Sequence, residues 1–134
     1  MIAVDQASKA AFPVVMRAIQ AGAKSVFVTV PGPVYDATLE FMARQDGFAA
    51  TFTTGYNWDK LEPFVDAVAA SDVVVLSEPG MLGQSLGGFT FPSVQFQAQL
   101  LSQLKGDTSF GGKPVFSDAQ GRSVWVFVRN SFSN

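Results

Sequence analysis

The feature that most constrains this fold is a run of four apolar residues, Val73 to Leu76, with no polar residue between them. A strand with this pattern is buried on both faces, which is typical of a parallel sheet covered by helices on each side. Residues 78–88 follow the run and contain a proline and four glycines, so they end the strand and predict a loop. In open α/β sheets, the loops at the carboxyl ends of the strands are where ligands bind.

Strands and helices alternate on the N-terminal side of this run. Two further strands are predicted at residues 24–30 and 48–54, which are rich in β-branched or aromatic residues and end at Pro31 and Gly55. The segments between the strands, residues 34–45 and 57–70, predict helices, the second of them capped by Asn57. This alternation is the signature of right-handed βαβ units and a mainly parallel sheet.

The two ends of the chain show less regular patterns. We interpret residues 1–4 as a short strand or a disordered tail, and Ser8 as the cap of a first helix that ends at Gly22. Near the other end, residues 114–117 and 123–129 predict two strands joined by a turn-rich segment, and hence an antiparallel hairpin. We expect the tail from Asn130 onward to fray.

Residues 91–104 fit two patterns. Every second residue from 94 to 100 is apolar with glutamine between, as in a strand, but residues 94, 98, 101 and 104 follow the spacing of a helix. We favour the helix, because glutamine and leucine are good helix formers. Pro92 and Ser93 also provide a start signal, and Lys105 and Gly106 a stop signal.

Together these elements predict one α/β domain over residues 1–134. Its three layers would hold a mainly parallel, doubly wound sheet of about five strands, flavodoxin-like or Rossmann-like, with the antiparallel C-terminal hairpin at the edge. A chain of 134 residues is long enough to bury a core without disulfides, and this chain has no cysteine.

From Lys24 to Gly83 the spacing of strands and helices resembles that of response-regulator receiver domains, and residues 72–81 resemble the segment around their phosphate-accepting strand. That family needs an aspartate at the end of this strand and an acidic pair after its first strand. Here Ser77 stands in the first place and Val28 and Thr29 in the second, so the magnesium site and the phosphoryl acceptor are missing. The resemblance therefore implies a fold and not an activity.

The residue types that the chain lacks exclude several classes of enzyme. Without His or Cys there is no Ser-His-Asp triad, no thiol nucleophile and no zinc site built on those ligands. Neither a Walker A pattern nor a Gly-x-Gly-x-x-Gly after a strand occurs, so both standard nucleotide fingerprints are missing. We therefore assign no catalytic residue, no metal and no cofactor, and favour a protein that is not an enzyme.

Charge and hydropathy limit the partners. The net charge is −2 and the nine Lys and Arg residues are scattered singly, so we expect no binding to nucleic acid. No apolar stretch approaches the roughly 18 residues of a membrane helix. Residues 1–4 are followed by Asp5 and lack the basic start of a signal peptide. We expect no membrane partner and a soluble protein that resides in the cytoplasm by default.

Three loops would gather at the carboxyl edge of such a sheet: residues 31–33, 53–57 and 78–88. Residues 53–57 could contact an anion, because their side chains donate hydrogen bonds and the next helix would present free N–H groups. Glu78 could act as a general acid or base, or as a magnesium ligand. The alternative for residues 53–57 is an asparagine cap after a tight turn. The alternative for Glu78 is a solvated loop carboxylate. The candidate ligand-binding residues are Thr53, Thr54, Gly55, Tyr56, Asn57, Glu78, Gly80, Gly83 and Ser85.

The composition favours a surface that a partner covers. Charged residues make up 15% of the chain, against roughly 25% in an average domain, and there are 13 Phe. The candidate interface residues are Phe89, Phe91, Phe96 and Trp125, and residues 123–129 are a candidate edge strand. We favour a non-catalytic domain that acts through protein–protein contacts as an assembly or scaffold subunit, either as a homo-oligomer or with another protein. The alternative is a protein that binds a small molecule (a flavin, nucleotide or sugar phosphate), or an enzyme acting on one, at the loops named above.

Overall fold

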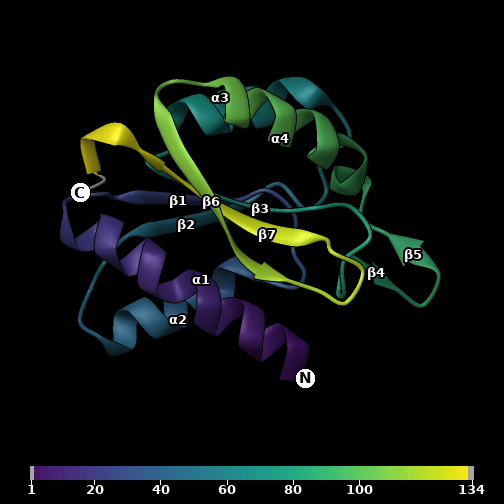
Figure 1. Cartoon of the computed structure of the whole chain (residues 1–134), viewed down its shortest axis with the longest axis horizontal. Helices are drawn as coiled ribbons and strands as arrows, with labels where there is room; N and C mark the ends of the chain where they lie inside the picture. The colour runs from purple at the N-terminus through teal and green to yellow at the C-terminus, as the bar shows by residue number, and fades with distance from the viewer. Residues whose placement is uncertain (1, 133–134) are drawn as a thin grey trace.

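Strand β3 (Val73–Ser77) lies at the centre of a five-stranded sheet. The order of its strands is β2 (Thr51–Thr54), β1 (Ser25–Val28), β3, β7 (Ser123–Arg129) and β6 (Phe110–Ser117). A computed structural model describes residues 2–132 and shows helices on both faces of this sheet (Figure 1). All residues of β3 are buried, as the unbroken apolar run predicts. β3 pairs in parallel with β1 (Ser25–Val28) and antiparallel with β7 (Ser123–Arg129).

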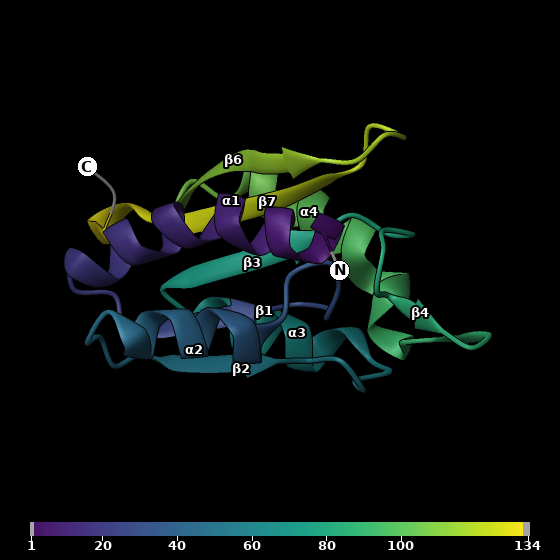
Figure 2. The ribbon, with the colours of Figure 1, turned by 90° about the horizontal axis from the view of Figure 1, so that it is seen from below.

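Two layers of helices cover the sheet. α1 (Ile2–Gln20) and α2 (Asp36–Gln45) lie on one face, and α3 (Leu61–Ala70) and α4 (Gln97–Gly106) lie on the other (Figures 1 and 2). β4 and β5 form a separate antiparallel hairpin that projects beyond the sheet (Figure 1). The remaining elements have these bounds: β4 (Ser85–Leu86), β5 (Phe89–Thr90), and the 3-10 helices η1 (Pro92–Phe96) and η2 (Asn130–Phe132).

Alternate residues of the central strand belong to two separate cores. Val73 and Val75 face α1 and α2, whereas Val74 and Leu76 face α3 and α4. Each of these four side chains is at most 1% exposed. Both faces of β3 are therefore shielded from solvent, which explains why its sequence shows no alternation of polar and apolar residues.

The architecture confirms the predicted α/β fold. β2, β1 and β3 are parallel and have the 2-1-3 order of flavodoxin-like domains, and beyond β3 the sheet continues with the antiparallel β6–β7 hairpin. The prediction of residues 123–129 as an edge strand is wrong, because β7 pairs with β3 and with β6, so β6 forms the edge. β6 also begins at Phe110 rather than at residue 114, since Gly111 and Gly112 have no side chains that would indicate a strand.

The prediction for the N-terminus is wrong in two respects. α1 begins at Ile2, so residues 2–4 are helical rather than a strand or a tail; residue 1 lies outside the described part of the chain. Ser8 is buried inside this helix and does not cap it. The physical reason is a buried stripe at helical spacing, formed by Ala7, Ala11 and Val15. This stripe includes the turn that contains Ser8, so the helix extends beyond Ser8 toward the N-terminus of the chain.

Other boundaries also differ from the sequence-based expectation. Asn57 does not cap α3, which begins at Leu61 after Lys60. Pro63 accounts for the late start, because proline is tolerated in a first turn, where its missing N–H would have no intrahelical partner. Residues 92–106 are helical in η1 and α4, which confirms the helix favoured there. Residues 130–132 form a 3-10 turn instead of a frayed tail; the rest of that predicted tail lies outside the described residues.

Arg129 ties the end of β7 to the end of α3. Its guanidinium donates hydrogen bonds to the carbonyl oxygens of Val68 (3.2 Å), Ala69 (3.1 Å) and Ser71 (2.7 Å), where the helix terminates. The same group lies 4.4 Å from the centre of the Phe110 ring. A cation at this position adds hydrogen bonds to carbonyls at the end of the helix, where the Val68 carbonyl also accepts from the Ser71 N–H, and it opposes the negative end of the helix dipole.

We expect Arg129→Ala to lower the free energy of unfolding by about 2 kcal/mol, because several charge-assisted hydrogen bonds are lost at once. Urea unfolding followed by circular dichroism measures this change. Arg44→Ala is the control: Arg44 forms an exposed ion pair with Glu40 at 3.0 Å, whose removal should cost at most about 0.5 kcal/mol. Equal losses for the two variants would show that Arg129 does not cap α3.

Candidate functional site

The connections that leave β1 and β3 meet at the carboxyl edge of the parallel strands. In this strand order, the gap between β1 and β3 is the place where flavodoxin-like domains bind ligands. Gly32 and Gly83 touch there: a Cβ atom on Gly32 would lie 2.5 Å from the carbonyl carbon of Gly83. Both have positive φ, +96° and +91°. The two predicted loops therefore converge, and their contact requires glycine on both sides.

The side chain of Gln84 fills the space between these two loops. It is 1% exposed, and its Nε2 donates to the carbonyl oxygens of Gly32 (3.1 Å) and Glu78 (2.8 Å). Its Oε1 accepts a hydrogen bond of 2.8 Å from the backbone N–H of Gly80. Gln84 thus satisfies three backbone groups that would otherwise be open to a ligand at this edge.

Glu78 is engaged by a tryptophan. The Nε1–H of Trp125 donates a hydrogen bond of 2.9 Å to Glu78 Oε2, and the carboxylate is half-buried. Among the side chains that the structure describes, those of residues 6–132, no three of His, Cys, Asp or Glu gather as metal ligands would. Glu78 is therefore placed to orient the Trp125 ring, and its role toward a ligand stays a prediction.

The other candidates in residues 78–88 also have partners within the chain. A Cβ atom on Gly83 would lie 2.4 Å from the Tyr35 hydroxyl, and one on Gly80 would lie 2.7 Å from the Arg122 guanidinium. The hydroxyls of Ser85 and Thr90 share a hydrogen bond of 2.7 Å across the β4–β5 hairpin. These residues shape the loop and hold the hairpin.

The loop of residues 53–57 lies beside the same edge but is held in a different way. Gly55 is buried, and a Cβ atom there would lie 2.5 Å from the Trp58 ring and 2.7 Å from the Phe64 ring. Close ring packing therefore requires this glycine. The carbonyl of Tyr56 accepts a hydrogen bond of 3.0 Å from the Ser93 hydroxyl.

The anion contact predicted for residues 53–57 lacks its expected geometry. Thr53 and Asn57 are exposed, whereas the Thr54 hydroxyl is buried without a hydrogen-bond partner in the described structure. The free N–H groups of α3 begin only at Leu61, further along the chain than expected. A ligand role for this loop stays a prediction.

A second buried glutamine links β1 to this region. The Thr29 hydroxyl donates to Gln97 Oε1, and Gln97 Nε2 donates a hydrogen bond of 2.8 Å to the carbonyl of Ser93. Thr29, Ser93 and Gln97 are all fully buried. Sequence reasoning missed these residues and Gln84, because a buried glutamine and an exposed one look alike in a single sequence.

The β4–β5 hairpin carries apolar side chains into solvent. Leu86 and Phe89 form a cross-strand pair next to its tip and are 79% and 56% exposed. The Phe89 ring packs edge-on against Phe91, with centroids 5.7 Å apart, and Phe91 packs edge-on against Tyr56 at 6.1 Å. We call Tyr56, Leu86, Phe89 and Phe91 the hairpin patch.

The other two interface candidates pack within the chain, on the face of α3 and α4. The Phe96 ring lies 5.6 Å from that of Phe64. Trp125 stacks on Phe127 at 5.9 Å, and the Lys105 ammonium lies 4.4 Å from its ring centre. Phe89 is therefore the most exposed of the predicted interface residues.

Asp118 lies at the turn between β6 and β7. Partial desolvation raises its pKa, but hydrogen bonds from the backbone N–H and the guanidinium of Arg122, together with the charge of Arg122, hold that pKa below its usual value. Arg122 Nε lies 2.8 Å from Asp118 Oδ2. This carboxylate stabilises the turn through its hydrogen bonds and is poorly suited to accept a proton.

Comparisons with protein-family models, with curated protein sequences and with solved structures found no match. Within residues 2–132, none of the helices combines the length and the apolarity needed to cross a membrane.

Proposed function

We propose that this chain is a non-catalytic interaction domain, an assembly or scaffold subunit, that self-associates through the hairpin patch. The observation that carries this proposal is the exposure of Leu86 (79%) and Phe89 (56%) on the β4–β5 hairpin. The hairpin itself projects from the domain (Figure 2). Large apolar side chains grouped on a protruding surface are typical of protein–protein contacts.

The base of the hairpin supports the proposal, because it is built to hold the tip in one position. The backbone N–H of Phe91 donates to the carbonyl of Gln84 (3.1 Å), and the Gln84 side chain is fixed by three hydrogen bonds of its own. Edge-on ring contacts continue from Phe89 through Phe91 to Tyr56. A rigid apolar tip loses little conformational entropy when a partner covers it, so contacts there are efficient.

A two-fold contact between two copies is the simplest arrangement for such a tip. In this arrangement the same surface serves both partners, so each copy contributes one Leu86 and one Phe89. Full burial of such a side chain contributes about 1.5–3 kcal/mol. Four of them offset a substantial part of the cost of association, which is about 4–15 kcal/mol, so a weak and concentration-dependent dimer is expected.

The side chains at the carboxyl edge of the sheet are engaged with one another, which favours a function in protein–protein contacts over catalysis. The space at the end of β1 and β3 is occupied by Gln84, and the nearby carboxylate of Glu78 is bound to Trp125. Ser77, at the end of β3, is buried, and its hydroxyl has no hydrogen-bond partner among the described residues. This edge offers no activated nucleophile in the described residues, whereas the hairpin offers an exposed surface.

Sedimentation equilibrium or light scattering over a range of concentrations tests this proposal. We expect the wild type to dimerise, and we expect the double variant Leu86→Ser, Phe89→Ser to dissociate at least about 100-fold more readily, since four apolar side chains leave the interface. Phe41→Ser is the matched control, because Phe41 is 62% exposed but lies on α2. A wild type that stays monomeric at every concentration, or an equal effect of Phe41→Ser, would contradict the proposal.

A further inference from the structure

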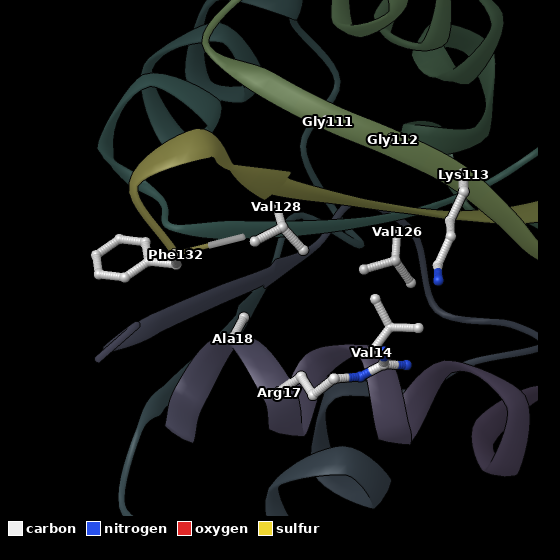
Figure 3. A pocket seen from close by; sticks show the side chains of 9 residues that line it. All are labelled: Val14, Arg17, Ala18, Gly111, Gly112, Lys113, Val126, Val128 and Phe132. Carbon is white, nitrogen blue, oxygen red and sulfur yellow. The ribbon is translucent and has the colours of Figure 1, made fainter. Parts of the chain in front are cut away.

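A pocket of about 290 Å³ lies between α1 and the β6–β7 hairpin, away from the hairpin patch (Figure 3). Its wall on the sheet side is formed by Val126 and Val128 of β7, which are 1% and 7% exposed. Val14 and Ala18 of α1 lie opposite them. The interior is therefore apolar, as is usual for sites that bind small molecules.

Two cations stand at this pocket, one from each side. Arg17 comes from α1 and Lys113 from β6, and Figure 3 shows their head groups converging beside Val14. Neither head group has an ion-pair or hydrogen-bond partner among the described residues, and none of the described residues that line the pocket is acidic. Two unpaired positive charges beside an apolar wall favour an anion that carries an apolar group.

Gly111 keeps this pocket open. A Cβ atom there would meet only Asn130 Oδ1, at 3.8 Å, and the backbone φ lies outside the left-handed region, so neither packing nor backbone conformation requires glycine. Gly112 differs, because its Cβ atom would lie 2.2 Å from the Phe127 ring on the other face of the sheet. Side chains alternate along a strand, so a side chain at residue 111 would project on the same face as Lys113, into the pocket.

We infer that this pocket binds a small carboxylate with an unbranched apolar chain, a medium-chain fatty acid in chemical terms. The carboxylate lies between Arg17 and Lys113, and the chain lies against Val126 and Val128. The volume of about 290 Å³ is at the lower end of that of small-molecule sites, so a short chain such as that of octanoate is the appropriate probe. No residue of the hairpin patch takes part, so this inference is independent of self-association.

Titration with octanoate, followed by isothermal calorimetry and by amide NMR shifts, tests the inference. We expect saturable binding of one octanoate per chain, with shifts in α1, β6 and β7. Octanol, which has the same chain without the charge, and acetate, which has the charge without the chain, should each bind at least tenfold more weakly. Equal affinity for octanol, or no saturable binding of octanoate at millimolar concentration, would overturn the inference.

Variants of the lining residues separate this pocket from any other site. Gly111→Leu fills the pocket and should abolish octanoate binding, while Arg17→Gln and Lys113→Gln should each weaken it about tenfold. Arg44→Gln, on α2, is the control for charge and should leave the affinity unchanged. Circular dichroism verifies that each variant is folded, and the two surface glutamine variants remain decisive if Gly111→Leu does not fold. Unchanged octanoate binding in Arg17→Gln and Lys113→Gln would overturn the inference.

Discussion

Gln84→Ala is expected to lower the free energy of unfolding by about 3–5 kcal/mol, the largest loss that we anticipate for one side chain outside the two cores. The substitution leaves the carbonyls of Gly32 and Glu78 and the N–H of Gly80 without their partner. An unsatisfied buried polar group costs about 1–3 kcal/mol, and these three groups lose their bonds together. Because Gln84 also fixes the base of the hairpin, the same variant should weaken self-association.

Urea unfolding of Gln84→Ala beside Gln45→Ala measures this loss. Gln45 is an exposed glutamine at the end of α2, where truncation to alanine should change stability by less than about 0.5 kcal/mol. A loss for Gln84→Ala no larger than that for Gln45→Ala would mean that water replaces the side chain without cost. In that case Gln84 would not hold the loops together.

Two adjacent glycines in β6 are expected to respond in opposite ways to alanine. Gly112→Ala places a Cβ atom about 2.2 Å from the ring of Phe127, which is 1% exposed and would have to shift within the core. Overpacking of this kind costs about 1–3 kcal/mol. Gly111→Ala makes only an ordinary van der Waals contact, with Asn130 Oδ1 at 3.8 Å, and removing a glycine from a strand interior gains about 0.5–1 kcal/mol.

The difference in stability between the two alanine variants is therefore expected to be about 1.5–4 kcal/mol, with Gly111→Ala at or above the wild type. Urea unfolding of both variants under one set of conditions gives this difference directly. The two substitutions are chemically identical and one residue apart, so each serves as the control for the other. Equal stabilities would mean that the Phe127 ring does not pack against the backbone of Gly112.

The parts of the fold that follow from local pattern were predictable from the sequence. The apolar run from Val73 to Leu76 indicates a doubly covered strand, and the strands and helices before it give the parallel half of the sheet. Patterns that depend on tertiary contacts misled the prediction. Ser8 has the chemistry of a cap but lies on the buried stripe of α1, and Asn57 precedes a helix that starts later because of Pro63.

The candidate sites show the same limit. The convergence of residues 31–33 with residues 78–84 follows from the strand order, so it could be anticipated. The filling of that space by Gln84 could not be, since nothing in a single sequence distinguishes a buried glutamine from a solvated one. In the same way, Gly111 and Gly112 are equivalent in the sequence. They differ only in the structure, where Gly111 faces the pocket and Gly112 faces the Phe127 ring on the other side of the sheet.

We propose above all that the hairpin patch is the surface through which this domain associates with a second copy. Amide NMR spectra recorded during dilution from about 1 mM to about 20 μM test it most directly, because a weak dimer dissociates within this range. We predict concentration-dependent shifts confined to Tyr56 and residues 84–91, which are lost in the double variant Leu86→Ser, Phe89→Ser. Spectra that do not change on dilution, or shifts that map to the β6 edge or to α2 instead, would contradict the claim.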